Sequence, residues 1–311
     1  MRKNNTMKST RRKNLMRKKN KGMGKSFKFL VLLFLVLGIF LFVYLRTVYW
    51  NGRDKLAFAF RMNSGDVGVT VADPKLIEIT TLVIPGDTQV DVAENYGTFR
   101  IKNVWQLSQN EKLKGRLLPE TITQNFLFPT FLWADISGIN IGNSSLSGIV
   151  KFIFASNATN IPFGDRLNLA LFALKVKGPG RTEINLGQSQ FLRKLKLNDG
   201  QTGYVLNGQP SSRLTVYFTD NTPSVSGTKV NIVDATGTSD VANKVGQIIE
   251  VMGAKVVSVE KKEPVGFGCE IAGADSEIVK KVLTLFSCTD GSRTSDFDLE
   301  IRLGQDFAKR F

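Results

Sequence analysis

The chain has 311 residues and a formal net charge of +15, with 42 Lys and Arg against 27 Asp and Glu. It contains no His and only two Cys, which excludes Ser-His-Asp triads, Cys-His pairs and H-E-x-x-H zinc sites. The length suggests about two domains. The chemistry left is that of carboxylates, Lys, Arg, hydroxyl groups and oxygen-bound metals.

The positive charge is concentrated at the N-terminus. Residues 1–28 contain twelve Lys and Arg and no acid, whereas from residue 54 onward 28 basic residues face 27 acidic ones. We interpret 1–28 as a basic cytoplasmic tail that sets the membrane topology, with contact to anionic lipid as an alternative role. Because the remainder is nearly neutral, we expect no nucleic acid partner.

An uncharged stretch follows the tail. The sequence FLVLLFLVLGIFLFVYL, residues 29–45, lies between Lys28 and Arg46, and a membrane span needs roughly 17–25 apolar residues. We predict a single transmembrane helix over 29–48. A cleaved signal peptide is the alternative, but no A-x-A cleavage pattern follows. The positive-inside rule then predicts a cytoplasmic N-terminus and an extracytoplasmic bulk.

The first exterior unit, residues 54–218, is predicted to be an α/β domain. VGVTVADP (67–74) and LIEITTLVIP (76–85) read as strands, and helices are expected at 94–107 and 117–128. The second strand ends in a Pro85-Gly86-Asp87 turn, where Pro presets the first turn angle and Gly allows the positive φ of a type II turn. Backbone geometry alone explains such a turn, so its sequence does not by itself indicate a functional site.

The segment TDNTPSVSGT, residues 219–228, is predicted to be a polar linker because it lacks periodicity. Beyond it, residues 229–311 read as a strand, a helix, two strands, a second helix and a closing strand. This βαββαβ order predicts a small two-layer domain with helices on one face of a sheet.

Two sequences in this second unit resemble the LytR C-terminal domain, an extracytoplasmic module. They are VNIVDATGTSDVANKVGQIIEVMGAKVVSV, which begins at Val230, and SDFDLEIRLGQDF, which ends at Phe307. The resemblance covers about 80 residues. The resemblance implies that this unit is extracytoplasmic, but it does not indicate a particular reaction.

The first unit resembles the catalytic domain of the LytR-CpsA-Psr family, in which a strand ends in Ile-Pro-Arg-Asp-Thr. Here Asp66 matches an upstream acid, and Asp87 and Thr88 match the end of the turn, but Gly86 replaces the family Arg. The resemblance implies an αβα-type fold, and Mg²⁺ or Mn²⁺ held by Asp66 and Asp87. Gly cannot supply the bidentate phosphate contacts of Arg. The ligand-binding candidates are therefore Asp66, Asp87 and Thr88 together with three other arginines, Arg100, Arg116 and Arg166.

Two functions follow from this resemblance. The first is a diverged or non-catalytic envelope protein that binds a cell-wall polymer, its lipid-linked precursor or an envelope partner. The alternative is a phosphotransferase that attaches glycopolymers from a polyprenyl-pyrophosphate carrier to peptidoglycan. Two or more cations facing an apolar tunnel near Asp66 and Asp87 would favour the enzyme, whereas a filled core would weaken it. The catalytic residues stay unknown.

The two cysteines, Cys269 and Cys288, are predicted to form a disulfide. The predicted compartment lies outside the reducing cytoplasm. Cys269 opens a short strand and Cys288 ends the helix that follows it, and a helix that packs back along its strand returns to the start of that strand. Two buried free thiols are the alternative.

Overall fold

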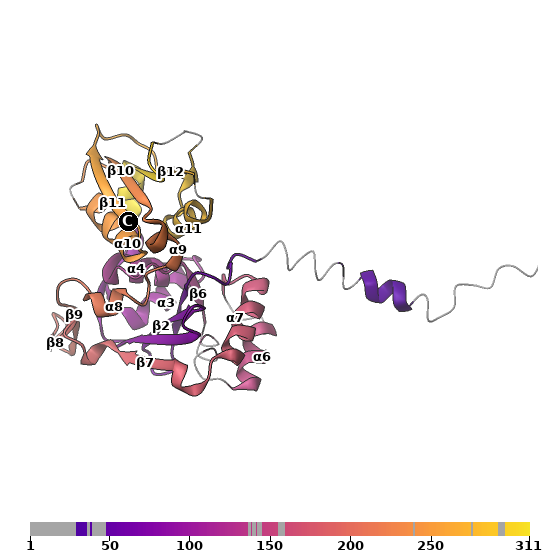
Figure 1. Ribbon diagram of the computed structural model, residues 1–311. Coiled ribbons are helices and arrows are strands. Elements are labelled where there is room, and N and C mark those ends of the chain that lie inside the picture. The colour runs from indigo at the N-terminus through magenta and orange to yellow at the C-terminus, as the bar shows by residue number, and fades with distance from the viewer. Residues whose placement is uncertain are drawn as a thin grey trace, which may run out of the picture. The chain divides into compact units, whose positions relative to one another are not determined.

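The computed structural model describes residues 29–35, 38, 48–135, 138, 141, 145–154, 159–238, 240–274, 276–291 and 296–311. Residues 29–35 are helical, but most of the predicted span 29–48 and all of the basic tail lie outside the described residues. Within the described ranges, no helix has the length and apolarity needed to cross a membrane. Residues 49–311 form one compact unit with a mixed α/β fold (Figure 1).

A five-stranded sheet forms the centre of the first half, in the order β6-β1-β2-β3-β7. In its middle, β2 (Val67–Asp73) runs antiparallel to both of its neighbours, β1 (Leu56–Arg61) and β3 (Glu78–Ile84). The edge strands β6 (Leu132–Ala134) and β7 (Arg181–Asn185) run parallel to their neighbours. Every residue of β2 is buried, which requires helices on both faces of the sheet.

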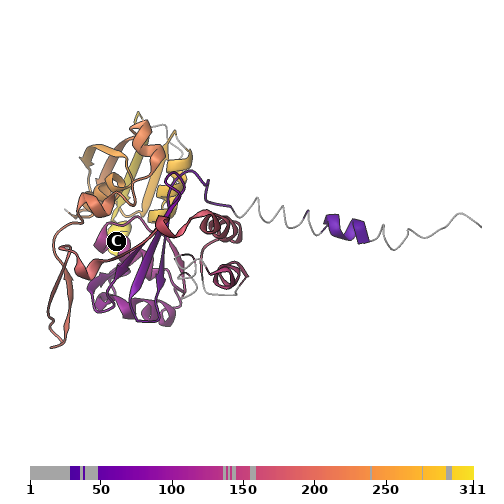
Figure 2. The same ribbon diagram turned by 60° about the horizontal axis from the view of Figure 1, so that its bottom comes forward.

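Helices cover both faces of this sheet (Figures 1 and 2). Helices α3 (Ile101–Asn110) and α4 (Leu117–Phe126) share one apolar core with the sheet. Helices α6 (Leu146–Phe154) and α7 (Phe163–Lys175) share a separate core with its other face. Alternate side chains of β1 enter the two cores, as the period of two in a strand requires. The predicted αβα layering of residues 54–218 is therefore present.

The helix predicted over 94–107 was wrong in its first half. Strands β4 (Gln89–Val92) and β5 (Gly97–Arg100) form a hairpin around the short 3₁₀ helix η1 (Ala93–Asn95), and α3 begins only at Ile101. Gly97 has a φ of +89°, which ends any helical run there. The hairpin pairs Arg100 with Gln89, and so places it close to the Pro85–Thr88 turn.

A second hairpin contacts the same turn. Strands β8 (Leu192–Lys196) and β9 (Thr202–Leu206) pair antiparallel, after the 3₁₀ helices η3 (Gly178–Gly180) and η4 (Leu186–Gln188). The backbone N–H of Tyr204 donates to the carbonyl of Asp87 over 3.1 Å. The short helix α8 (Ser212–Thr215) then leads to the second half.

The second half is built on a sheet in the order β11-β10-β14-β12-β13. The predicted βαββαβ order is present as β10 (Lys229–Ala235), α10 (Val241–Val251), β11 (Lys255–Lys261), β12 (Cys269–Gly273), α11 (Ser276–Phe286) and β14 (Leu299–Gly304). The two-residue strand β13 (Thr289–Asp290) and helix α12 (Gln305–Arg310) are additions. Helices α10 and α11 share a single core with the sheet.

The predicted disulfide between Cys269 and Cys288 is confirmed, with 4.6 Å between the two Cα atoms. The two cysteines are brought together by strand pairing, and not only by a helix that packs back along its strand. Strand β13 pairs in parallel with β12, Glu270 opposite Thr289, so Cys288, which directly precedes β13, lies beside Cys269 at the start of β12. The bridge closes a separation of 19 residues, which in the chain-entropy model stabilises the fold by about 3 kcal/mol.

Part of the predicted linker over 219–228 is helical. Residues 221–226 form helix α9 (Asn221–Ser226), which ends at Gly227 in the left-handed region. The backbone N–H of Asp220 donates to the Met252 carbonyl, and Thr222 donates to Asp54. These polar groups find partners in both halves and hold the segment in place.

A buried ion cluster joins the two halves at this point. The Lys281 ammonium on α11 lies 2.6 Å from Asp54 and 3.0 Å from Asp220, whose side chains are 1% and 8% exposed. Although burial opposes the change, bonds from Lys281 and Thr222 lower the pKa of Asp54. Burial raises the pKa of Asp220 to about 6, despite the attraction of Lys281.

The raised pKa of Asp220 predicts that stability falls as pH rises from about 4 to about 6. In this window native Asp220 holds a proton that the unfolded chain releases, so unfolding becomes easier by on the order of 2–3 kcal/mol. Burial also raises the pKa of Glu120, to about 7, so Asp220→Asn should make this slope shallower, without removing it, in thermal unfolding of the detergent-solubilised protein. The exposed Asp290→Asn should retain it, and equal slopes in all three proteins would contradict the assignment.

Candidate functional site

The Pro85–Thr88 turn is closed by its own hydrogen bonds. Thr88 is fully buried, and both its backbone N–H and its hydroxyl donate to the Pro85 carbonyl, over 2.9 and 2.7 Å. The Thr88 carbonyl accepts from Ile101, so the turn is fixed to the start of α3. Thr88 was predicted as a ligand-binding candidate, but its hydroxyl hydrogen already has a partner within the turn.

Asp66 lies beside this turn, as the motif order predicted. One carboxylate oxygen accepts from the Gly86 backbone N–H over 2.8 Å, and the other accepts from the Ser64 hydroxyl over 2.9 Å. The loop before β2 is therefore bonded to the end of β3. The fold brings Asp66 and Asp87 to the same surface, although they are 21 residues apart in the sequence.

Two cations converge on Asp87. A guanidinium nitrogen of Arg100 lies 2.7 Å from the same carboxylate oxygen that the Lys102 ammonium approaches to 2.6 Å. The other terminal nitrogen of Arg100 pairs with Asp199 over 2.7 Å. Bonds from Lys102 and then Arg100 lower the pKa of Asp87. Of the three predicted arginines, Arg100 is the one that reaches the turn.

Arg116 and Arg166 lie elsewhere. Arg116 pairs with Glu94 and with Glu120 at the start of α4. Arg166 belongs to α7, on the opposite face of the sheet from α3, with its guanidinium 5.8 Å from the centre of the Phe163 ring. Sequence position could not separate these arginines, because only the β4–β5 hairpin decides which of them meets Asp87.

Gly86 has a different role from the one predicted. Its φ lies outside the positive region, so the expected type II geometry was wrong. The constraint is space: a Cβ at this position would lie 2.4 Å from the Gly65 carbonyl oxygen and 3.2 Å from the Lys102 Cβ. The loop before β2 therefore occupies the volume that an Arg side chain would need to leave this turn.

A polar depression of about 550 Å³ opens beside the turn. Sequence reasoning missed most of its lining, because η4 and the β8–β9 hairpin carry no recognisable motif. Lys194 contributes a cation there, with its ammonium 5.9 Å from the Tyr204 ring centre. The depression is lined by Asp66, Pro85, Gly86, Asp87, Asn185, Gly187, Gln188, Lys194, Thr202 and Tyr204.

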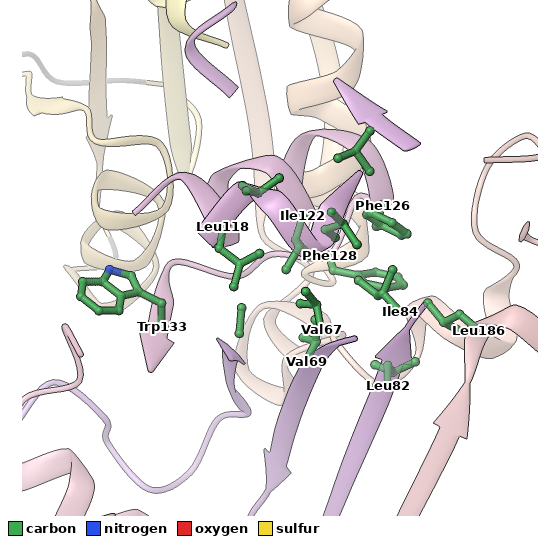
Figure 3. Packing of buried hydrophobic residues seen from close by; sticks show 14 of the residues in the cluster. Val67, Val69, Leu82, Ile84, Leu118, Ile122, Phe126, Phe128, Trp133 and Leu186 are labelled. Carbon is green, nitrogen blue, oxygen red and sulfur yellow. The ribbon is translucent and has the colours of Figure 1, made fainter. Parts of the chain in front are cut away.

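The space behind the turn is a packed core. Side chains from β2, β3 and α4 fill the layer between sheet and helices (Figure 3). Phe126 and Phe128 are fully buried with ring centres 5.9 Å apart, and Trp105 and Trp133 pack edge to face. These aromatic residues, which could also have lined a lipid channel, are core residues here.

A smaller cavity of about 140 Å³ lies at the other end of the sheet. Phe131, Phe218 and Leu285 line it together with Leu56 and Val71. Val71 is five residues along β2 from Asp66, which corresponds to about 16 Å in a strand. This cavity is therefore separate from the polar depression beside Asp87.

The carboxylates fit a metal ion only in part. Among the residues that the structure describes, no group of three or more His, Cys, Asp or Glu side chains is arranged to hold one. Asp66 and Asp87 together offer a pair of carboxylates, and Asp87 already contacts two cations. Mg²⁺ is often bound by one or two carboxylates together with substrate phosphates. The pair could thus hold Mg²⁺ or Mn²⁺ only with a phosphate-bearing ligand.

Comparisons with known proteins give weak structural likenesses. No protein-family model matches the chain, and no curated protein matches it. TagT of B. subtilis is 11% identical, with a TM-score of 0.38 over 51% of this chain and 87% of that one. The LytR-CPS2A-psr family protein YwtF (TagT) with bound octaprenyl pyrophosphate lipid is 11% identical, with a TM-score of 0.33 over 52% and 89%.

A transcriptional regulator from Enterococcus faecalis, EF0465, covers more of the chain. It is 8% identical, with a TM-score of 0.38 over 76% of this chain and 94% of that one. TM-scores below 0.5 carry no argument about a shared fold or function. None of the comparisons supports the LytR C-terminal resemblance of residues 229–311, which stays a prediction.

Because no space is left for a Cβ at Gly86, we expect any side chain at this position to destabilise the fold. Gly86→Ala should lower the free energy of unfolding by about 1–3 kcal/mol, because its Cβ would displace the Gly65 carbonyl. Gly86→Arg, which restores the family residue, should destabilise at least as much. Gly266→Ala is the matched control, since nothing lies within 4 Å of a Cβ there. Denaturant unfolding that shows equal stability for Gly86→Ala and wild type would contradict this reason for glycine.

Proposed function

We propose that this chain is a membrane-anchored, extracytoplasmic envelope protein of the LytR-CpsA-Psr type. It binds a phosphate-bearing cell-wall polymer in the polar depression beside Asp87 and does not transfer it. The observation that carries the proposal is the turn itself: Arg100 and Lys102 are engaged by Asp87, while the Gly86 position is closed by Gly65.

The electrostatics of the turn favour binding over transfer. A transferase needs positive groups aimed at the charge that develops on the phosphates. Here Arg100 is held between Asp87 and Asp199, and its side chain is 11% exposed. Gripping a pyrophosphate would require the guanidinium to leave both carboxylates, so the turn is ordered by ion pairs that compete with that reaction.

The packed core supports the same conclusion. A polyprenyl tail needs an apolar channel next to its phosphates, and the layer behind the turn is filled by buried side chains such as Ile84, Leu118 and Phe126. Protein interiors are packed to crystal-like density and do not admit further volume without rearrangement. A lipid-linked precursor is therefore a poorer fit than a soluble polymer.

The lining of the depression indicates the ligand chemistry. Lys194 adds a positive charge to a lining that also holds the carboxylates of Asp66 and Asp87, and it has no salt-bridge partner among the described residues. Asn185, Gln188 and the Tyr204 hydroxyl supply neutral donors and acceptors along the same wall. A sugar or polyol phosphate offers hydroxyl groups and anionic oxygens to match. Peptidoglycan or another envelope protein is a less direct match to this charge.

The alternative is a working glycopolymer phosphotransferase. The convergence of Arg100 and Lys102 beside Asp87 is the one feature that favours it. In that case Arg100→Ala should abolish transfer of a labelled polymer from its polyprenyl-pyrophosphate carrier to peptidoglycan. Measurable transfer by the wild-type protein, lost in this variant, would overturn the non-catalytic proposal.

The binding site is tested by a pair of neighbouring cations on β8. Lys194→Ala should weaken binding of poly(glycerol phosphate) roughly ten-fold, because a bond to a charged group contributes about 1.5–3 kcal/mol. Arg193→Ala is the matched control, since successive strand residues point to opposite faces. Calorimetric titration of the full chain, with and without Mg²⁺, measures both. Equal affinities for the two variants would place the ligand elsewhere.

The membrane topology also stays a proposal, supported by the charge asymmetry around residues 29–48. A protease added to intact spheroplasts should digest residues 54–311 and leave the basic tail protected. A cytoplasmic marker protein, which should stay intact, controls for lysis. Protection of the C-terminal half in intact spheroplasts would reverse the orientation and the extracytoplasmic function with it.

A further inference from the structure

Helices α6 and α7 expose large apolar side chains. On α6, Leu146, Val150 and Phe154 recur every four residues and so lie along one face. On α7, Leu171 and Leu174 are also more than half exposed. Exposed apolar side chains in such a group mark an interaction surface more often than isolated ones do.

The topology places α7 across one end of the first sheet. The residues just before α7 bond to β6, where Asn160 donates to the Phe131 carbonyl. The residues just after it enter β7, where Arg181 pairs with Ile79. Strands β6 and β7 are the two edges of the sheet and both run parallel to β1, so they begin at the same end. Helix α7 therefore runs from one edge to the other along that end.

The turn between β2 and β3 extends the apolar surface at this end. Leu76 and Ile77 are each more than half exposed, and a Cβ at Gly180 would lie 3.0 Å from the Ile77 carbonyl oxygen. We name the exposed apolar side chains placed at this end the end patch: Leu76, Ile77, Leu171 and Leu174. Helix α6 adjoins it where the Phe154 ring lies 6.3 Å from the Phe163 ring of α7.

The first residues of the compact unit are fixed to α7. The backbone N–H groups of Tyr49 and Trp50 both donate to the Asp165 carboxylate, over 2.9 to 3.1 Å. The Trp50 ring also packs edge to face on Phe172, with centres 5.8 Å apart. In the sequence, Tyr49 directly follows the segment expected to span the membrane. The chain is therefore held at α7 where it leaves that segment.

The exposed charges around the end patch are mostly positive. Between residues 145 and 180, the exposed charged side chains in the described ranges are Lys151, Lys175 and Lys177, while Asp165 is buried. Lys75 adds a fourth cation beside Leu76, and Glu78 is an exposed acid after Ile77. Apolar side chains interleaved with lysines are typical of surfaces that lie in the interface of a membrane with anionic lipids.

We propose that the end patch docks on the outer surface of the membrane and contacts anionic phospholipids. The inference rests on the proposed membrane anchor, because Tyr49 lies at the bilayer surface only if residues 29–48 span it. The apolar side chains enter the headgroup and acyl boundary, and the lysines contact lipid phosphates. Docking adds a second attachment to the anchor and orients the sheet relative to the bilayer.

The test uses a single fluorescent label in the full-length chain. Both native cysteines are in the disulfide, so a cysteine introduced at Leu171 is the sole free thiol. The Leu171→Cys protein, labelled with an environment-sensitive dye, is reconstituted into nanodiscs that contain phosphatidylglycerol and a lipid quencher. The label should lose most of its emission. Val257→Cys, an exposed apolar position on β11, is the matched control and should keep its emission.

The outcomes separate the inference from the proposed function. Unquenched emission at Leu171 in chains that co-elute with nanodiscs would overturn docking and leave the anchor intact. Chains that fail to enter nanodiscs would overturn both. Emission that changes with the number of chains per nanodisc, but not with the quencher, would assign the end patch to a second copy and overturn docking. Adding Lys151→Glu, Lys175→Glu and Lys177→Glu should reduce the quenching at Leu171.

Discussion

The contact between Lys281 and the two carboxylates of Asp54 and Asp220 determines how the two halves of residues 49–311 are assembled. Asp54 precedes the first strand, Asp220 precedes α9, and Lys281 belongs to α11, so one ammonium group joins three distant segments. A buried ion cluster of this kind contributes little net stability, because desolvation offsets the attraction. Loss of one partner is costly, however, since it leaves a buried charge unpaired. The cluster therefore specifies one arrangement of the two halves.

The features that the sequence could predict are those that depend on local patterns of residues. Regular spacing of apolar residues, with a period of two in strands and 3.6 in helices, predicts β2, β3, α10 and the βαββαβ order. The tertiary contacts agree with this local preference. The disulfide was predictable because Cys269 and Cys288 flank one strand–helix unit. By contrast, residues 94–100 look helical by composition, but Gly97 and the pairing of β5 with β4 override that preference. The sequence could not show that segment 219–228 would be held by Asp54 and Met252, because these partners are distant in the sequence.

The candidate site shows the same limit. The motif order predicted a shared site for Asp66 and Asp87, and both line the polar depression. It could not predict that Lys102 would join Arg100 on Asp87, or that Arg116 would instead pair with Glu94 and Glu120. Nor could it explain why residue 86 is glycine. The reason is the Gly65 carbonyl oxygen, which leaves no space for a Cβ, and not a positive φ angle. Lys194 and Tyr204 carried no signal at all, since their relevance depends on where the β8–β9 hairpin folds.

The packed helix α9 fixes the spacing between the two halves of the compact unit. Two modules on a flexible linker can adjust their spacing, and their joint binding depends on an effective concentration set by linker length. Here the spacing between the depression beside Asp87 and any surface on residues 229–311 is fixed. Any ligand long enough to reach both would therefore meet them at one separation only.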